Sequence, residues 1–533
     1  MSSTTKGHLL MRLTRRQALT LLGAAAPALA LRPAFADTTL PIASGPFTGT
    51  RSSLQAYRIP EWFADAKFGI WSHWGPQSGV EDGDWYARTM YIQGSPQYNY
   101  HVKTYGHPSK VGYKDLIPLF KGDRWDPEHL MDLYVKAGAK YFFSMGVHHD
   151  NFDMWNSKYQ PRWNAVATGP KRDIVGLWKQ AARKRGLRFG VSEHLSNSFS
   201  WLAPSHLSDS TGPLAGVPYD GTLPAYADLY HDYSGEPADF AKTTQAMSRN
   251  APDWWKLQYF RRIKDLVDQH QPDLLYTDGG IPFDEYGYSL VANLYNVSAA
   301  RHGGKVEAIY NSKTPPDCAI GTCALDRERG VLDDISPTPW QTDTCIGEWH
   351  YKRGTKYKSA KKVIDLLVDI VSKNGNLLLN FPLPNSGELD ADERVTLSGI
   401  TDWMAVNSEG IYSTRPWKVF GEGPAMKVVV PKNGKEFDPN EGKKPDLNAA
   451  DIRFTTKGST IYAFVQGWPE GAAIINSLGT ASPQNPPKIT RVTMLGHNEN
   501  LKFNQESAAL RVTLPNNALP TSNIGITLKI ATT

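Results

Sequence analysis

The sequence predicts an α/β protein in which a (β/α)8 barrel of the TIM type is followed by a C-terminal β-sandwich. Short apolar strands alternate with amphipathic helices between residues 54 and 415, and such alternation favours a barrel over a doubly wound sheet. No glycine-rich phosphate loop follows the first strand, so a nucleotide-binding sheet fits less well. From residue 416 to 533, short strands lie between polar turns, which is typical of an all-β domain.

The elements of the barrel are expected in alternation. We predict strands at 67–71, from Tyr141 onward, and at 187–191, 274–277, 306–310 and 376–380, with the sixth and seventh strands within 330–351. Helices are predicted at 126–139, 172–185, 252–270 and 359–372. The first helix has a clear start, because Asp126 is a favourable N-cap and Pro127 suits the first helical position. Strands of the sandwich are predicted at 427–430, 461–466, 489–495, 510–514 and 524–530.

Residues 1–36 have the pattern of an export signal. They contain five basic residues and no acidic one, and an apolar run at 18–31 follows the pair Arg15-Arg16. The sequence Ala-Phe-Ala at 34–36 suits cleavage, and paired arginines before a modest apolar run resemble a twin-arginine signal. An ordinary general-secretion signal is the alternative. We therefore expect the protein to be periplasmic or secreted, in a bacterium.

The charge of the mature chain excludes two classes of partner. The full chain has a formal net charge of +5, and the export signal supplies five basic groups, so the remainder is close to neutral. A net charge near zero implies no basic surface for nucleic acid or for an anionic membrane. We expect neither as a partner, and a neutral substrate suits such a chain.

Three cysteines, Cys318, Cys323 and Cys345, lie in one loop-rich window. A bridge between Cys318 and Cys323 can form after export, which leaves Cys345 unpaired. The odd count excludes a disulfide framework, and no zinc-type spacing is present.

Ionisable side chains follow each of the first four predicted strands. His73 follows the first strand, His148 and His149 the second, His194 the third and Asp278 the fourth. In a barrel these strand ends meet on one face, where barrel enzymes carry their active sites. A structural role in the core remains the alternative for any single histidine, but a shared active site explains the whole set.

Two chemistries could use such a rim. A zinc hydrolase needs several ligands converging on one ion, and the adjacent His148 and His149 would point to opposite faces of an extended chain. A glycoside hydrolase needs a pair of carboxyl groups, with imidazoles and aromatic rings holding the sugar. Asp278 can supply one carboxylate from a rigid strand end, although it could instead cap the next helix. The second chemistry fits the sequence better.

A series of motifs then makes the family recognisable. They occur in order between Trp62 and Trp417: FGIWSHWG at 68–75, Trp-Tyr at 85–86, HHDxFxxW at 148–155, KRDIV at 171–175, LYTDG at 275–279, GNLLLN at 375–380 and GIY at 410–412. On these motifs the chain resembles the family-29 glycoside hydrolases, the α-L-fucosidases. The resemblance implies a barrel, a retaining mechanism, and neither a metal nor another cofactor.

The resemblance also implies roles for single residues. Asp278 would be the nucleophile, and the sugar-binding residues would be His73, Asp84, Trp85, Tyr86, His148, His149 and His194. Asp84 stands where the family often has a glutamate, so its contact with a sugar hydroxyl is expected to differ. Glu193-His194 stands where many members have a tyrosine.

The acid/base is not assigned by the resemblance. In barrel order it should come from a loop after the fourth strand, where the candidates are Asp326, Glu328, Asp333, Asp334 and Glu348. Glu328 is favoured because LDRERG resembles an Asp-x-Glu-Arg-Gly segment of some family members, and Glu348 is the alternative. A solvated salt-bridge cluster is the structural interpretation of Glu328. Its neighbouring arginines would lower its pKa unless burial or the charge of Asp278 raises it.

Together these observations predict an exo-acting, retaining α-L-fucosidase that removes terminal α-L-fucose from oligosaccharides or glycoconjugates. One alternative is a glycosidase of the same family acting on a related sugar, such as an α-L-galactoside. The other is a non-catalytic sugar-binding protein. For the C-terminal domain we favour a structural role over carbohydrate binding.

Overall fold

The computed structural model describes residues 40–533 except 234–250, 320, 429–439, 444 and 518. The predicted export signal at 1–36 lies outside the described residues. Residues Ile42–Thr533 form one unit, to which the following description applies. None of the helices in the described ranges combines the length and the apolar character that a membrane span requires.

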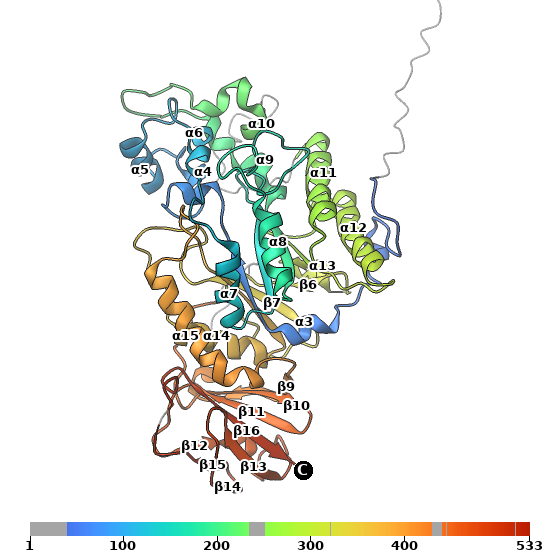
Figure 1. Ribbon diagram of the computed structural model, residues 1–533, viewed down its shortest axis with the longest axis vertical. Coiled ribbons are helices and arrows are strands. Elements are labelled where there is room, and N and C mark those ends of the chain that lie inside the picture. Colours follow the sequence, from blue (N-terminus) through green and yellow to red (C-terminus); the bar gives the residue numbers. More distant parts are fainter. Residues whose placement is uncertain (1–39, 234–250, 320, 429–439, 444, 518) are drawn as a thin grey trace, which may run out of the picture. The chain divides into compact units, whose positions relative to one another are not determined.

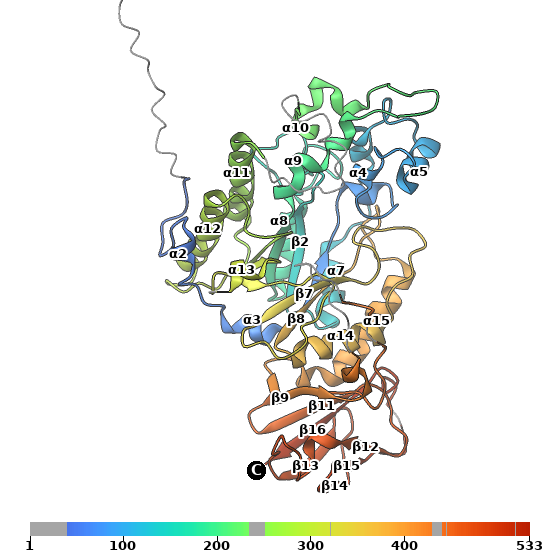
Figure 2. The same cartoon turned by 180° about the vertical axis from the view of Figure 1, so that it is seen from behind.

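Eight parallel strands form the barrel (Figures 1 and 2). In chain order they are β1 (Phe68–Ser72), β2 (Tyr141–Val147), β3 (Arg188–Glu193), β4 (Leu274–Thr277), β5 (Ile309–Ser312), β6 (Ala324–Leu325), β7 (Trp340–Cys345) and β8 (Gly375–Asn380). Their lateral order is β6-β5-β4-β3-β2-β1-β8-β7. A bridge between Asp326 and Gln341 joins the end of β6 to β7 and brings the two edges together. The predicted barrel is confirmed.

Helices surround the barrel. The longer ones are α7 (Pro127–Lys136), α8 (Ile174–Lys184), α11 (Asp253–His270), α12 (Glu285–Arg301), α14 (Ala360–Ser372) and α15 (Ala391–Asn407). Asp126 caps α7 as predicted, since its carboxylate accepts the N–H groups of Glu128 and His129, both at 3.0 Å. The sequence pattern did not predict α12, in which residues 289–296 are all buried. The polar side chains of this stretch, such as Asn293 and Asn296, are buried as well, so it lacks the exposed polar face of a surface helix.

Two strand predictions in this region were displaced. The fifth strand was expected at 306–310, but β5 begins at Ile309, where pairing with Leu274 of β4 starts. The sixth strand was expected within 330–351, whereas β6 is Ala324–Leu325. A strand of two residues has too few positions to show alternation, so its pattern carries no signal.

Two long insertions cover the carboxyl ends of the strands. One follows β1 and contains α4 (Tyr86–Thr89), α5 (Pro96–Thr104) and α6 (Tyr113–Leu116). The other follows β3 and contains α9 (Ser198–Trp201) and α10 (Ala227–Tyr230). They lie side by side in Figures 1 and 2, and buried tyrosine–aspartate hydrogen bonds join them, from Tyr91 to Asp220 at 2.7 Å and from Tyr98 to Asp209 at 2.6 Å. These insertions form one side of the rim above the barrel.

The C-terminal domain consists of two antiparallel sheets. The larger sheet has the order β13 (Ile489–Met494), β16 (Ile526–Thr532), β11 (Thr460–Val465), β10 (Ile452–Lys457) and β9 (Arg415–Glu422). The smaller sheet has the order β12 (Ala472–Ile475), β15 (Leu510–Thr513) and β14 (Phe503–Gln505). Phe454, Val465 and Leu528 of the larger sheet share one apolar core with Ile475 and Leu510 of the smaller.

This arrangement confirms the predicted all-β sandwich. The predicted strand at 427–430 is wrong at its start, because 424–427 form a 3-10 helix that begins with Pro424, and 429–430 lie outside the described residues. Proline has no N–H for a strand ladder and favours the first turn of a helix.

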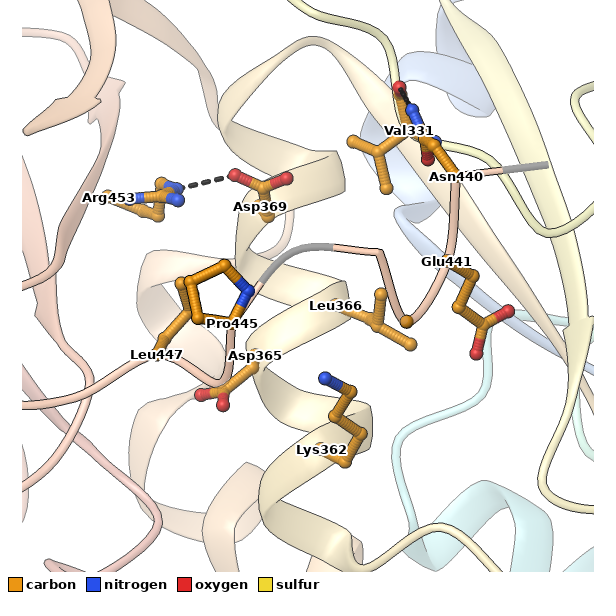
Figure 3. A pocket seen from close by; sticks show the side chains of 11 residues that line it. Val331, Lys362, Asp365, Leu366, Asp369, Asn440, Glu441, Pro445, Leu447 and Arg453 are labelled. Carbon is orange, nitrogen blue, oxygen red and sulfur yellow. Dashed lines mark hydrogen bonds and ion pairs between the residues drawn. The ribbon is translucent and has the colours of Figure 1, made fainter. Parts of the chain in front are cut away.

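The C-terminal domain packs against α14 (Figure 3). Arg453 of β10 donates to Asp369 of α14 at 2.5 Å, and Lys373 contacts the same carboxylate at 2.9 Å. Burial opposes ionisation of Asp369, but these two cations hold its pKa below the ordinary value. The pair therefore ties the sandwich to the barrel through an ionised carboxylate.

The cysteines pair as the sequence suggested was possible. Cys318 and Cys323 form a disulfide, and Cys345 at the end of β7 is free and buried. The bridge closes the turn between β5 and β6.

Candidate active site

The predicted site residues gather at the carboxyl ends of neighbouring strands. His73, His148, His194 and Asp278 are each the first residue after β1, β2, β3 and β4. Backbone hydrogen bonds extend the ladder to these positions, since His194 N–H donates to Val147 O at 2.9 Å and Asp278 N–H to Glu193 O at 3.1 Å. Their side chains are therefore directed by the sheet itself.

The imidazole rings form one buried cluster. The ring centres of His148 lie 4.6 Å from His149, 4.8 Å from His194 and 5.0 Å from His73. Both ring nitrogens of His73 and of His194 are buried without a hydrogen-bond partner. Buried polar atoms are rarely left unpaired in proteins, so these nitrogens are available to a ligand.

Burial keeps most of these rings neutral. It lowers the pKa of His73 well below its ordinary value, and the neighbouring His350 and His194 lower it further. Burial and the adjacent imidazoles likewise lower the pKa of His148. A neutral imidazole carries one donor and one acceptor, which is what a sugar hydroxyl can pair with.

The tautomer of His148 follows from its neighbours. Gln77 Oε1 accepts the backbone N–H of Ala87 at 3.3 Å, so its amide nitrogen faces His148 Nδ1 at 2.9 Å. The amide donates to Nδ1, and the proton of the neutral ring is therefore on Nε2. That nitrogen lies 3.8 Å from Asp84 Oδ1.

His149 occupies a different position, between two acceptors. Its Nδ1 faces the carbonyl of His194 at 3.0 Å, and its Nε2 faces Asp278 Oδ2 at 3.1 Å. The ring can donate to both only as an imidazolium. A neutral ring donates to one of these two acceptors at a time.

Asp278 lies among cationic and imidazole groups. Lys313 Nζ contacts Asp278 Oδ1 at 2.5 Å, and His194 Nδ1 lies 3.4 Å from Oδ2. Burial opposes ionisation, yet Lys313, His194 and His149 hold the pKa of Asp278 well below the ordinary value. The side chain keeps 21% of its surface exposed, so an ionised carboxylate is accessible to a substrate.

Glu328 lies on the other side of the same ammonium group. Lys313 Nζ contacts Glu328 Oε2 as well as Asp278, which keeps the nearest oxygens of the two carboxyl groups within about 5 Å of each other. Burial raises the pKa of Glu328 although Lys313 lowers it, and the charges of Asp343 and Asp278 raise it further. One carboxyl group is thus biased toward ionisation and the other toward protonation, which is a typical acid/base assignment.

The other acid/base candidates lie elsewhere. Glu348 is exposed, and so are Asp333 and Asp334. Asp326 is fully buried, and its carboxylate accepts a hydrogen bond from Gln341 at 2.6 Å. Glu328 contacts Lys313, the cation that also contacts Asp278.

The Asp84–Trp85–Tyr86 loop divides between two locations. Asp84 Oδ1 contacts His350 Nδ1 at 2.6 Å and so belongs to the imidazole cluster. Trp85 is 38% exposed, with its ring centre 6.1 Å from His149. Tyr86 is fully buried, and its hydroxyl pairs with His101 Nδ1 at 3.0 Å, so it supports the loop from behind and does not reach the cluster.

Several residues of the site were not predicted. Lys313 is the first residue after β5, so the rule that found the histidines would have found it if the fifth strand had been placed correctly. His350 and Trp349 come from the loop after β7, with ring centres 4.6 and 5.5 Å from His73. They follow the strand by several residues, so strand-end position gives no signal for them. Gln77 had no signal of its own.

The cluster also contains potential metal ligands. Donor atoms of His73, Asp84, His148 and His350 lie within 4.8 Å of one another. Imidazole and carboxylate are ligands that zinc accepts. Asp84 pairs with His350 and Gln77 pairs with His148, so the protein orders this set by its own hydrogen bonds.

A barrel with paired carboxyl groups and a rim of imidazole and indole rings defines the class of glycoside hydrolases. Comparison with known families agrees, since residues 34–409 match the family described as alpha-L-fucosidase and residues 445–531 match the alpha-L-fucosidase C-terminal domain. The chain belongs to the α-L-fucosidase family and is a glycoside hydrolase, as the motifs predicted.

Individual relatives support this assignment. The tissue alpha-L-fucosidase of Homo sapiens is 28% identical over 482 residues, which cover 88% of each chain. The plasma alpha-L-fucosidase of Homo sapiens is 29% identical over 486 residues, again covering 88% of each. The crystal structure of Thermotoga maritima alpha-fucosidase in complex with fucose superposes with a TM-score of 0.67 at 26% identity, covering 91% of this chain and 100% of the other.

Proposed function

We propose that the protein is an exo-acting, retaining α-L-fucosidase that releases terminal α-L-fucose from oligosaccharides or glycoconjugates. The observation that carries the proposal is the contact of Lys313 with both Asp278 and Glu328, which keeps the two carboxyl groups close together. Retaining glycosidases have carboxyl groups about 5–5.5 Å apart, whereas inverting enzymes leave about 6.5–9.5 Å for a water molecule. The fucosidase names of the relatives, and the fucose in the Thermotoga maritima structure, support fucose as the sugar.

In the first step Asp278 attacks the anomeric carbon of the fucoside. Its carboxylate is ionised because Lys313, His194 and His149 favour the charged form. Glu328 donates its proton to the glycosidic oxygen while the bond from that oxygen to the anomeric carbon breaks. The products of this step are the free alcohol and a fucosyl ester of Asp278.

In the second step Glu328 acts as the base. The ester no longer carries the negative charge of Asp278, and that charge is one of the causes of the raised pKa of Glu328. Formation of the ester therefore lowers the proton affinity of Glu328, as its change of role requires. Glu328 takes a proton from water, the water oxygen bonds to the anomeric carbon, and the ester bond breaks with net retention.

The imidazole cluster is proposed to bind the sugar hydroxyls. His73 and His194 have unpaired ring nitrogens, and His148 is held in a defined tautomer by Gln77. Trp349 and the partly exposed Trp85 can cover the apolar side of the sugar, including its methyl group. Asp84 is oriented by His350 and can accept a hydrogen bond from a hydroxyl.

We further propose that residues 1–36 direct export, that 54–415 form the catalytic domain, and that the sandwich at 416–533 has a structural role. The ion pairs between Asp369 of α14 and Arg453 of β10 support a fixed attachment of the sandwich.

Turnover of chromogenic glycosides tests the proposed function. We expect the purified protein to hydrolyse an aryl α-L-fucoside, with α-L-fucose as the first product seen by NMR and the β-anomer appearing only later, by mutarotation. An aryl α-L-galactoside, which adds a hydroxyl at C6, should be a poorer substrate. Equal or better turnover of the galactoside would reassign the sugar, and a β-anomer as the first product would exclude the retaining mechanism.

A further inference from the structure

Backbone hydrogen bonds to β7 fix the chain on both sides of Glu328. Arg327 N–H donates to Gln341 O and Arg329 N–H donates to Asp343 O, both at 2.9 Å. These two amides continue the parallel pairing of β6 beyond its end. Glu328 lies between them, and its side chain contacts Lys313.

The residue after Glu328 has an unusual conformation. Arg329 has φ of 47°, in the left-handed region that residues with a side chain seldom adopt. Such a conformation persists when the surrounding contacts determine it. The residues that contact Arg329 therefore stabilise the backbone turn that follows Glu328.

The side chain of Arg329 donates to Cys345 Sγ at 2.8 Å, and a short segment of the C-terminal part of the chain supplies further contacts to its backbone and to Val331. Glu441 N–H donates to Arg329 O at 2.9 Å. The side-chain amide of Asn440 accepts Val331 N–H and donates to Val331 O, both at 2.8 Å, and Figure 3 shows this pairing. Glu441 thus binds Arg329, the left-handed residue itself, and Asn440 binds Val331, two residues later.

The same segment is itself anchored to the barrel. Glu441 Oε2 accepts the hydroxyl of Thr344 on β7 at 2.5 Å, and Oε1 pairs with Lys358 Nζ at 2.7 Å. Its side chain is only 10% exposed. The position of Glu441 is therefore fixed against the same strand that holds Arg327 and Arg329.

We propose that Asn440 and Glu441 are positioning residues for the acid/base of this enzyme. They fix the left-handed turn at Arg329 and so hold the Glu328 carboxyl in contact with Lys313 and near Asp278. The inference rests on the proposed role of Glu328. Asn440 and Glu441, which lie after the barrel in the chain, would then affect proton transfer by Glu328 as well as the structure.

Loss of this support should affect one class of substrate. Asn440→Ala removes both hydrogen bonds to Val331 without touching the sugar site. Misplacement of a catalytic group by about 1 Å can cost roughly a hundredfold in rate. We expect kcat/KM for a fucosyl disaccharide, whose leaving group needs a proton, to fall about 10- to 100-fold. A dinitrophenyl fucoside, whose leaving group departs unaided, should change less than about twofold, with KM unchanged for both.

Two variants serve as controls. Asn440→Asp keeps the acceptor for Val331 N–H and loses only the donor, so its loss should be smaller than that of Asn440→Ala. Asp446→Asn removes an exposed ion pair with Lys362 of α14, at 2.5 Å, and keeps both Asn440 and Glu441. It should behave as wild type on both substrates. Thermal unfolding of each variant checks that the protein is folded.

A double variant separates positioning from a general loss of stability. If Asn440 acts through Glu328, Asn440→Ala should cost less than about twofold on the disaccharide once Glu328→Ala is present. Equal losses on both substrates, an undiminished loss in the Glu328→Ala background, or no loss at all would overturn the inference. If Glu328→Ala alone fails to discriminate between the substrates, the assignment of Glu328 is at fault instead, and the inference falls with it.

Discussion

The ammonium group of Lys313 separates the two carboxyl groups of the site, and its removal should shift the pH dependence of catalysis. Lys313→Met keeps a side chain of similar length and loses the charge. Asp278 and Glu328 would then face each other directly, with oxygens within about 5 Å. At an effective dielectric constant of about 20, two unit charges at that distance repel by about 3 kcal/mol, or roughly a hundredfold in the population of the doubly ionised form.

The sign of the shift follows from the causes of each pKa. Lys313 lowers the pKa of Asp278, so the ionised nucleophile of the variant should form only at higher pH. Lys313 also lowers the pKa of Glu328, so the protonated acid of the variant should persist to higher pH. Both limbs of the profile of kcat/KM against pH should therefore move upward.

The assay is hydrolysis of an aryl fucoside across the pH range, with stopped samples read at one alkaline pH. Lys313→Arg retains the charge and should keep both limbs near their wild-type positions, whatever its maximal rate. Lys184→Met serves as a control. It removes a lysine that is 70% exposed and pairs with Glu128, outside the site, so the pH profile should be unchanged. Unmoved limbs in Lys313→Met, or limbs that move toward acid, would refute the bridging role.

Further predictions concern the nucleophile, metal dependence, export and stability. Asp278→Gly should lose turnover by several orders of magnitude, and azide should restore part of it with a product of inverted configuration; near-normal activity would contradict the assignment. Dialysis against a chelator should leave the rate unchanged, and a loss that zinc reverses would revive a metal-dependent mechanism. Changing Arg15 and Arg16 to lysine should retain the protein in the cytoplasm, whereas unchanged export would indicate general secretion. Arg262→Met leaves the buried Asp153 carboxylate, now 2.5 Å from Arg262 Nη2, without its partner; denaturant unfolding should show a loss of about 3–5 kcal/mol, and a loss below about 1 kcal/mol would mean that this pair is dispensable.

The sequence predicted the parts of the site that depend on strand ends. His73, His148, His194 and Asp278 could be found because each directly follows a strand with a strong apolar pattern. Lys313 also directly follows a strand. That strand was predicted about three residues too early, because apolar residues precede β5, whereas pairing with β4 starts at Ile309. The general fold was accessible for the same reason, because most barrel strands contain a short apolar run.

Other features depend on contacts between distant parts of the chain. The middle of α12 is buried on every side, so its sequence shows no amphipathic period. The two-residue β6 is too short to show a period. Tyr86 stands in a motif beside Trp85, yet its hydroxyl is directed to His101 by packing within the insertion after β1. His350 reaches Asp84 across 266 positions of sequence. Propensity and spacing do not encode such contacts.

The short β6 has a consequence for the motions of the barrel. At the edge where β6 and β7 meet, the ring is joined through the Asp326–Gln341 bridge and the amides of Arg327 and Arg329. Opening free energies vary across a protein, and they are smallest where few backbone hydrogen bonds hold a segment. Glu328, the proposed acid/base, thus lies at the edge where the barrel closes. Amide hydrogen exchange at this edge should be faster than within β1 and β2. Its rate would report how often the backbone around Glu328 opens.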